Sequence, residues 1–277
     1  MSYELIAFDL DGTLLASDKS VLPSSVVSID EAVAAGKAVA ISSGRSPSMV
    51  TIYRDILPGI RYAICSAGAI VYDLMEDRAL YCHPLDHELV EKVIRTSDEA
   101  AGAGNYILKI GTPDAVYMEE REIAMCERCG IGVYEDLLRS INVPVEDAHA
   151  VALDPSTTVC KMVLHFPEVE LRDRVYGALR AEDLMISACE VSSVEFTAAG
   201  VNKGSALQRL AQILGLDISQ TIAVGDAEND LAMIRAAGLG VAMGNALPAV
   251  VEAAGTKVAD CDHGGCAEAI RRFLLAE

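Results

Sequence analysis

Two aspartates near the start of the chain, Asp9 and Asp11, directly follow a short apolar run, residues 5–8. Such a run is typical of a buried parallel strand. Residues i and i+2 of a strand point to the same side, so both carboxylates can face one small space. They would repel each other there unless a cation is bound. Mg²⁺ is the expected cation, because it takes oxygen ligands and is usually held by one or two carboxylates together with substrate phosphate.

A second polar group follows another predicted strand. Residues 37–41 are apolar after a single lysine, and Ser43, Gly44 and Arg45 come next, just before a helix that is expected to begin at Ser46-Pro47. A hydroxyl group and the backbone N–H groups at a helix start suit a phosphate oxygen. The pattern therefore indicates a second place where a phosphate group can bind.

Two more charged groups lie far along the chain. Lys203 opens a predicted helix, where the helix dipole makes a positive charge mildly unfavourable, so we expect an anionic or carboxylate partner for it. Residues 221–224 predict another buried strand, which is followed by Asp226, Asn229 and Asp230. Acidic residues therefore again lie at the carboxyl end of a strand, the edge at which open α/β sheets bind ligands.

In this order and spacing, the four groups resemble the motifs of the haloacid dehalogenase (HAD) superfamily of phosphohydrolases, and most closely those of its Cof-type subfamily, which carries a large α/β cap. The family pattern Asp-x-Asp-Gly-Thr is matched by residues 9–13, and Gly-Asp-x-x-Asn-Asp by residues 225–230. Ser43 and Lys203 match the family's hydroxyl residue and lysine, and the run at 238–246 is also similar to the family's sequence.

The chain departs from the subfamily at one position. Ala67 stands where Cof-type proteins usually have the asparagine of an Asn-Gly-Ala sequence. A polar contact in the active site is therefore expected to be missing or to come from another residue.

The resemblance implies a Mg²⁺-dependent phosphatase, a phosphoric monoester hydrolase that acts on small phosphorylated metabolites such as sugar or cofactor phosphates. It implies that Asp9 is the nucleophile and forms an aspartyl-phosphate, and that Asp11 is the general acid and base. Mg²⁺ would be held by Asp9, the backbone carbonyl of Asp11 and Asp226, with Asp230 supporting the metal site. The phosphate-binding residues would be Gly12, Thr13, Ser43 and Lys203, with further substrate contacts at Gly44, Arg45 and Asn229.

The expected fold is α/β, with a Rossmann-like parallel-sheet HAD core and an inserted α/β cap domain. The core is expected to comprise residues 1–83 and 192–277, and the cap residues 84–191. Within the cap, the sequence predicts a charged helix from Glu119 to Cys129, whereas residues 130–155 show no clear pattern.

The composition narrows the possible partners. The chain has 277 residues, with 41 Asp and Glu against 22 Lys and Arg, a formal net charge of −19. This balance argues against binding to nucleic acid or to anionic membranes. The start of the chain shows no signal-peptide pattern, and no apolar run is long enough to span a bilayer. We therefore expect a cytoplasmic protein, and the resemblance implies that its partner is a small-molecule phosphate ester.

Two other functions are compatible with these motifs. A sugar phosphomutase could use the same aspartates, and a non-catalytic protein could bind phosphorylated metabolites. A binder has no need of both a nucleophile and an acid, so the presence of Asp9 together with Asp11 favours an enzyme. Asp11 also favours phosphoryl transfer over dehalogenation. Cys126 and Cys129 form a single CxxC with no matching second pair, which predicts reduced thiols rather than a redox or zinc site.

Overall fold

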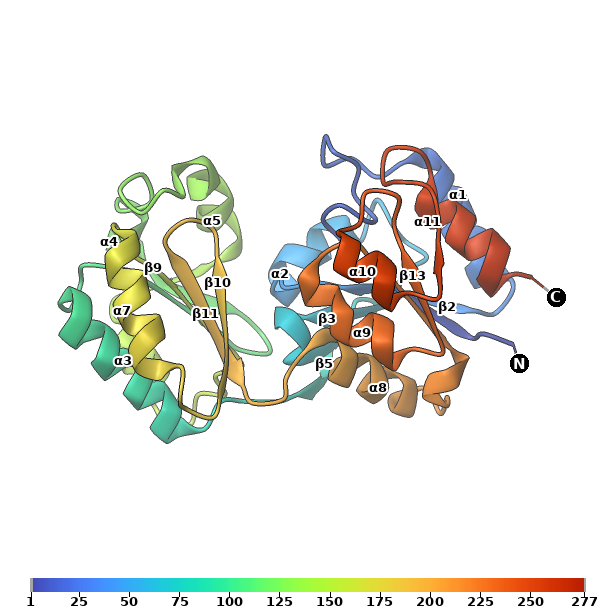
Figure 1. The fold of residues 1–277 in the computed structure, drawn as a ribbon. Helices are drawn as coiled ribbons and strands as arrows, with labels where there is room; N and C mark the ends of the chain where they lie inside the picture. The colour runs from blue at the N-terminus through green and yellow to red at the C-terminus, as the bar shows by residue number, and fades with distance from the viewer. Residues whose placement is uncertain (1, 277) are drawn as a thin grey trace. The chain divides into compact units, whose positions relative to one another are not determined.

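The computed structural model describes residues 2–276, and the chain divides into two compact units (Figure 1). The first, which we call the core unit, comprises residues up to Tyr81 and those from Asn202 onward. The second, the inserted unit, comprises residues 82–201. Both combine helices with a sheet, so the predicted α/β class is confirmed. No helix in the described range is long and apolar enough to cross a membrane.

The core unit is built on an eight-stranded sheet with the order β14-β13-β12-β1-β2-β3-β4-β5. From β14 to β3 each strand is parallel to its neighbour, whereas β4 is antiparallel to β3. This arrangement follows the predicted Rossmann-like pattern, in which apolar strands alternate with helices. The strands are β1 (Leu5–Phe8), β2 (Ala38–Ser42), β3 (Tyr62–Cys65), β4 (Ile70–Asp73), β5 (Arg78–Cys82), β12 (Thr221–Gly225), β13 (Leu239–Ala242) and β14 (Thr256–Lys257).

Helices contribute the remaining apolar residues of the core. Leu5 and Ala7 alternate along β1 and pack in one buried cluster with Leu207 and Leu210 of α8. Helices α1 and α11 contact each other and lie side by side (Figure 1). The helices of this unit are α1 (Pro23–Ala34), α2 (Pro47–Val50), α8 (Lys203–Ile213), α9 (Leu231–Ala236), α10 (Pro248–Ala253) and α11 (Gly265–Ala269).

The inserted unit has its own six-stranded sheet, ordered β10-β11-β9-β6-β7-β8. Its strands are β6 (Ile107–Gly111), β7 (Val116–Glu119), β8 (Val143–Val145), β9 (Lys161–His165), β10 (Leu184–Cys189) and β11 (Ser193–Ala198). Its helices are α3 (His87–Ala101), α4 (Glu120–Ile123), α5 (Glu135–Ile141), α6 (Ala148–Leu153) and α7 (Val169–Leu179). Elements α5, β8 and α6 fill the segment 130–155 that had no clear sequence pattern.

The helix expected from Glu119 to Cys129 is wrong in length, because α4 ends at Ile123. Beyond it, the backbone N–H groups of Met125 and Cys126 donate to carbonyls three residues back, as in turns. Cys126 and Cys129 are buried in an apolar cluster with Ile123. Burial of these side chains, rather than helical periodicity, therefore determines the backbone conformation of this segment.

The second junction between the units lies between Val201 and Asn202 rather than at 191–192. Strand β11 is the reason, because it pairs with β10 and β9 and so belongs to the sheet of the inserted unit. The sequence pattern alone does not distinguish the last strand of an inserted sheet from the first strand of the resumed core.

The cysteine pair of the CxxC sequence lies in the inserted unit. Cys126 and Cys129 are free and buried. Burial raises the pKa of Cys126 and raises that of Cys129 to about 11. A thiol with a raised pKa is a poor nucleophile near neutral pH, and the reduced state of this pair stays a prediction. The side chain of Cys189 lies outside the described part of the chain.

We predict that Ala67→Asn stabilises the protein. Ser66 and Ala67 both have positive φ, 52° and 59°, and the Ala67 N–H donates to the carbonyl of Ser43. A left-handed conformation costs an ordinary L-residue about 1–2 kcal/mol, whereas Asn tolerates it. The free energy of unfolding should therefore rise by roughly 1 kcal/mol in Ala67→Asn and fall in the β-branched Ala67→Val, as measured by urea unfolding. Equal stability of the two variants would contradict this explanation.

Candidate active site

The carboxyl ends of β1 and β12 bring the predicted acidic residues together. Phe8 of β1 pairs with Val224 of β12, and the Asp9 N–H donates to the Val224 carbonyl at 2.9 Å. Asp9 and Asp226 therefore follow two neighbouring parallel strands at one edge of the sheet. The chain proceeds from β1 to β2 on one side and from β12 to β13 on the other. Such a switch point is where open α/β sheets bind ligands.

Lys203 is the centre of this edge. Its Nζ donates to Asp9 Oδ1 at 2.5 Å and to Asp230 Oδ1 at 2.7 Å, and all three residues are buried. Lys203 is held at the first position of α8 by Asn202, whose side chain accepts hydrogen bonds from the N–H groups of Gly204 and Ser205. Lys203 therefore has two carboxylate partners, where one anionic or carboxylate partner was expected.

The other acidic residues complete a cluster of carboxylates. Asp9, Asp226 and Asp230 each offer an oxygen, and these atoms lie within 4.8 Å of one another. Oδ2 of Asp230 accepts the N–H groups of Asp226 and Ala227, so both oxygens of Asp230 are already used within the protein. A donor set of clustered carboxylates fits a hard divalent cation.

The pKa values show that one lysine does not balance this cluster. Burial raises the pKa of Asp9 to about 7, although Lys203 opposes the rise. Burial also raises the pKa of Asp226, with Asp230 adding to the effect. Burial acts to lower the pKa of Lys203, but Asp9 and Asp230 outweigh it and the pKa is raised. Three carboxylates and one ammonium leave excess negative charge, which a bound cation would offset.

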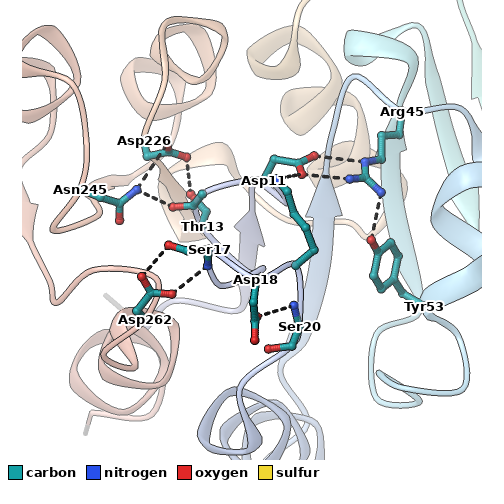
Figure 2. Close-up of polar contacts among 12 residues, drawn as sticks. Asp11, Thr13, Ser17, Asp18, Ser20, Arg45, Tyr53, Asp226, Asn245 and Asp262 are labelled. Atoms are coloured by element: carbon teal, nitrogen blue, oxygen red, sulfur yellow. Dashed lines mark hydrogen bonds and ion pairs between the residues drawn. The ribbon is translucent and has the colours of Figure 1, made fainter. Parts of the chain in front are cut away.

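Asp11 lies apart from this cluster and is held by Lys19 and by Arg45, whose contacts Figure 2 shows. Arg45 donates from Nε to Oδ2 at 3.1 Å and from Nη2 to Oδ1 at 2.9 Å, and Lys19 donates to Oδ1 at 2.9 Å. Arg45 is itself braced by the hydroxyl of Tyr53. Burial acts to raise the pKa of Asp11, but Lys19 and Arg45 outweigh it and the pKa is lowered. The side chain is therefore ionised in this arrangement.

Gly12 and Thr13 connect the first motif to Asp226. Thr13 Oγ1 donates to Asp226 Oδ1 at 2.8 Å (Figure 2). Gly12 has a φ of +79°, and a Cβ at this position would lie 2.5 Å from Asp226 Oδ2, so only glycine fits. The threonine hydroxyl thus positions an acidic residue, while its predicted phosphate contact relies on the backbone N–H.

Asn245 is a site residue that the sequence reasoning missed. Its Nδ2 donates to the Gly12 carbonyl at 2.8 Å and lies 3.5 Å from Asp226 Oδ2 (Figure 2). Its Oδ1 accepts the Cys261 N–H. The Asn245 side chain therefore connects the loop after β1 with Asp226 and Cys261, which lie in later loops. The available signal was the similarity of residues 238–246 to the family's sequence, which gave no role to this amide.

The remaining predicted residues have less definite positions. Ser43 is buried directly after β2, and its Oγ accepts the Arg45 N–H at 3.3 Å. Gly44 follows in the same turn, and Asn229 is exposed. Six of the predicted residues therefore lie together in the structure, namely Asp9, Gly12, Thr13, Lys203, Asp226 and Asp230. Asp11 is instead paired with Arg45. The Asn229 side chain has no hydrogen-bond partner in the described range. The catalytic and binding roles of these residues stay predictions.

Comparison with known proteins agrees with this geometry. The model of the haloacid dehalogenase-like hydrolases matches residues 6–270. The chain belongs to this family. Its similarity to YxeH, a putative phosphatase of Bacillus subtilis (strain 168), is 28% identity over 99% of this chain and all of that protein. HMP-PP phosphatase of Serratia proteamaculans (strain 568) is 31% identical, over 89% of this chain and 85% of its own.

Solved structures show the same fold. A haloacid dehalogenase-like hydrolase from B. subtilis superimposes with a TM-score of 0.79 at 26% identity, covering 98% of this chain and all of that one. One from Bacteroides thetaiotaomicron gives a TM-score of 0.82 at 23% identity, covering 98% and 99%, which shows the fold alone. The predicted membership of the HAD superfamily is confirmed, and the chain is a phosphatase of this family, a phosphoric monoester hydrolase.

We predict that Lys203→Met destabilises the core unit strongly. The change leaves Asp9 and Asp230 buried without their ammonium partner, and breaking such a pair costs about 3–5 kcal/mol. Urea unfolding should show this loss, and adding Asp9→Asn should restore part of it because one buried charge is then removed. Lys92→Met is the control, because Lys92 is ion-paired with Glu182 but 39% exposed, where loss of a pair costs about 1 kcal/mol or less. Equal losses in the two lysine variants would contradict the assignment.

Proposed function

We propose that this phosphatase hydrolyses phosphate monoesters of small metabolites, with Mg²⁺, through an aspartyl-phosphate on Asp9. The observation that carries the proposal is the cluster of Asp9, Asp226 and Asp230 around the buried Lys203. Relatives support small phosphorylated substrates by their names, which include HMP-PP phosphatase and 5-amino-6-(5-phospho-D-ribitylamino)uracil phosphatase.

Asp9 and Asp226 are the proposed direct ligands of Mg²⁺. Asp230 is assigned to orienting them, because its two oxygens are already bonded to Lys203 and to two backbone N–H groups. Thr13 and Asn245 hold Asp226 in place through its carboxylate oxygens. When bound, Mg²⁺ supplies positive charge to the phosphate oxygens and offsets the excess negative charge of the cluster.

The proposed reaction has two steps. In the first, a carboxylate oxygen of Asp9 attacks phosphorus while the bond to the leaving oxygen breaks, and Asp11 gives that oxygen its proton. In the second, Asp11 takes a proton from water as the water oxygen attacks phosphorus, which releases inorganic phosphate and restores Asp9. Lys203, already 2.5 Å from Asp9, offsets charge on the phosphoryl group, and Ser43 with the N–H groups of the Gly12 turn holds its oxygens.

The inserted unit is assigned as the α/β cap domain that the resemblance implies. A cytoplasmic location remains part of the proposal.

Phosphate release from a panel of metabolite monoesters tests the function. Wild type should release phosphate only with Mg²⁺, and Asp9→Asn should release none. A phosphomutase would instead need a bisphosphorylated sugar and release little phosphate. If wild type releases nothing, even from p-nitrophenyl phosphate, the hydrolytic proposal fails and a binding role takes its place.

Asp11→Asn should slow hydrolysis most for esters whose leaving oxygen must be protonated as it departs. Loss of general acid catalysis costs about 10²- to 10⁴-fold in kcat. For alkyl phosphates, whose alkoxide needs the proton, kcat should fall by this amount. During the first step, p-nitrophenolate leaves without a proton, so the burst of p-nitrophenol from p-nitrophenyl phosphate should be nearly unchanged in stopped-flow measurements. Equal loss for both leaving groups would remove the acid role of Asp11.

Mg²⁺ should raise the melting temperature, and more at about pH 8 than at about pH 5.5. Burial raises the pKa of Asp9 to about 7, so the stability that its proton provides is complete in acid and is lost as the pH rises through 7. Mg²⁺ replaces that proton at high pH and competes with it at low pH. A concentration of 100 times Kd contributes about 2.7 kcal/mol.

Asp226→Asn is the control for this measurement, because it removes one proposed ligand and should abolish most of the shift. An unchanged shift in Asp226→Asn, or no shift in wild type at pH 8, would contradict the metal site.

A further inference from the structure

Two cysteines that are far apart in the sequence have their thiol groups side by side in the inserted unit. Cys82 is the last residue of β5 and the first residue of this unit, and Cys160 directly precedes β9. A hydrogen bond joins the two thiol groups. Because a long stretch of chain separates the two residues, no local sequence pattern indicates this contact.

Backbone hydrogen bonds hold both cysteines in place. The Leu85 N–H donates to the Val159 carbonyl at 2.8 Å, so the segment that follows Cys82 lies against the residue before Cys160. The Cys160 N–H donates at 2.8 Å to the carbonyl of Gly111, the last residue of β6. The side chains of Leu85 and Val159 are buried. The contact between the thiols is therefore part of the packed structure of the inserted unit.

The two thiols differ in their access to solvent. Cys160 is fully buried, whereas Cys82 is partly exposed. Among the cysteines whose side chains the structure describes, Cys82 alone is not buried. Burial raises the pKa of the Cys160 thiol, and the Cys82 thiol beside it adds to the effect. A dissolved oxidant therefore reaches Cys82 first, and Cys160 is protected until its neighbour has reacted.

A metal site does not account for this pair of thiols. Two cysteines are half of the usual ligand set of a structural Zn²⁺ ion, which is held in a tetrahedral arrangement. Within the described part of the chain, no further His, Cys, Asp or Glu offers an atom within 4.8 Å of both sulfur atoms. The chemistry that remains for two adjacent thiols without further ligands is the formation of a disulfide.

The CxxC pair is less suited to this reaction. Cys126 and Cys129 are both buried, so an oxidant in solution does not reach either sulfur directly. The Sγ of Cys129 donates to the His165 carbonyl at 3.5 Å and so has a partner other than Cys126. Of the two pairs, only Cys82 with Cys160 combines a contact between the thiols with access from solvent.

We propose that Cys82 and Cys160 form a reversible disulfide in the presence of hydrogen peroxide, which makes the pair a redox modification site of the inserted unit. In the first step the Cys82 sulfur attacks peroxide, the O–O bond breaks, and a sulfenic acid forms on Cys82 with release of water. The Cys160 sulfur then attacks the Cys82 sulfur, and the sulfenic oxygen leaves as a second water with the proton of the Cys160 thiol. The two sulfur atoms together lose two electrons, which the peroxide gains. Because the thiols are already in contact, the second step needs little movement.

Treatment of the reduced protein with a small excess of hydrogen peroxide at neutral pH tests the proposal. After the remaining thiols are blocked with N-ethylmaleimide, mass spectrometry of the unreduced peptides should show Cys82 joined to Cys160. Dithiothreitol should restore both thiols. A disulfide between other cysteines, or oxidation of Cys82 to a sulfinic acid while Cys160 stays reduced, would overturn the proposal.

Two variants test the order of the steps and the identity of the pair. Cys82→Ser removes the partly exposed thiol, and Cys160 should then stay reduced under the same treatment because the oxidant does not reach it. Cys126→Ala removes one thiol of the CxxC pair and should still form the link between Cys82 and Cys160. Oxidation of Cys160 in Cys82→Ser at the rate seen in wild type, or loss of the link in Cys126→Ala, would contradict the proposal.

Thermal unfolding gives a second readout of the same bond. A disulfide between residues that are already in contact restrains the unfolded chain, and the loop that it closes here spans roughly eighty residues. The oxidised protein should therefore melt roughly 5–10 °C above the reduced protein, whereas peroxide should not change the melting temperature of Cys82→Ser. A lower melting temperature after oxidation of wild type would show that the bond distorts the fold, and it would overturn the inference.

Discussion

A single positive charge buried between two negative ones holds the candidate active site of this protein together. Lys203 joins Asp9 at the end of β1 to Asp230 near the start of α9, and it is itself the first residue of α8. Asp230 in turn accepts the N–H groups that follow β12 and so fixes Asp226. The ends of two strands and the starts of two helices therefore depend on one ammonium group. The three carboxylates carry more negative charge than this one ammonium group can balance. The arrangement that orders the site therefore also favours the binding of a cation.

The sequence predicted the parts of the site that local pattern determines. Apolar runs marked β1, β2 and β12, and the residues directly after them are at the carboxyl edge of the sheet, as expected for Asp9, Ser43 and Asp226. The contacts of Asn245 were not predictable, because it meets Gly12 across more than two hundred residues of chain and no local periodicity records such a pairing. The same holds for β11, because its pairing with β10 and β9 places it in the inserted sheet and no local pattern predicts such pairing.

Two aspartates two residues apart have opposite environments. Burial raises the pKa of Asp9, whereas Lys19 and Arg45 lower that of Asp11. The proposed chemistry needs the reverse, an ionised nucleophile and a protonated acid. A cation beside Asp9 favours its ionised form, and separation of Asp11 from Arg45 and Lys19 removes the charges that keep it ionised. The Arg45 guanidinium, which also donates a hydrogen bond to Tyr53, therefore keeps Asp11 ionised in the described arrangement. The ion pair of Arg45 with Asp11 must separate before Asp11 can act as an acid. Sequence alone gave Arg45 only a general role in substrate contact, because ion-pair geometry is not visible in a motif.

The central claim is that Asp9 carries the phosphoryl group during turnover. The most direct measurement is rapid mixing of Asp11→Asn with p-nitrophenyl phosphate and Mg²⁺, followed by an acid quench and mass spectrometry of the peptides. Asp11→Asn keeps the nucleophile but lacks the base that activates water, so the intermediate should accumulate. The account predicts one phosphoryl group on Asp9, formed as fast as the burst of p-nitrophenol. A phosphoryl group on another residue, or steady turnover with no phosphorylated peptide, would contradict it.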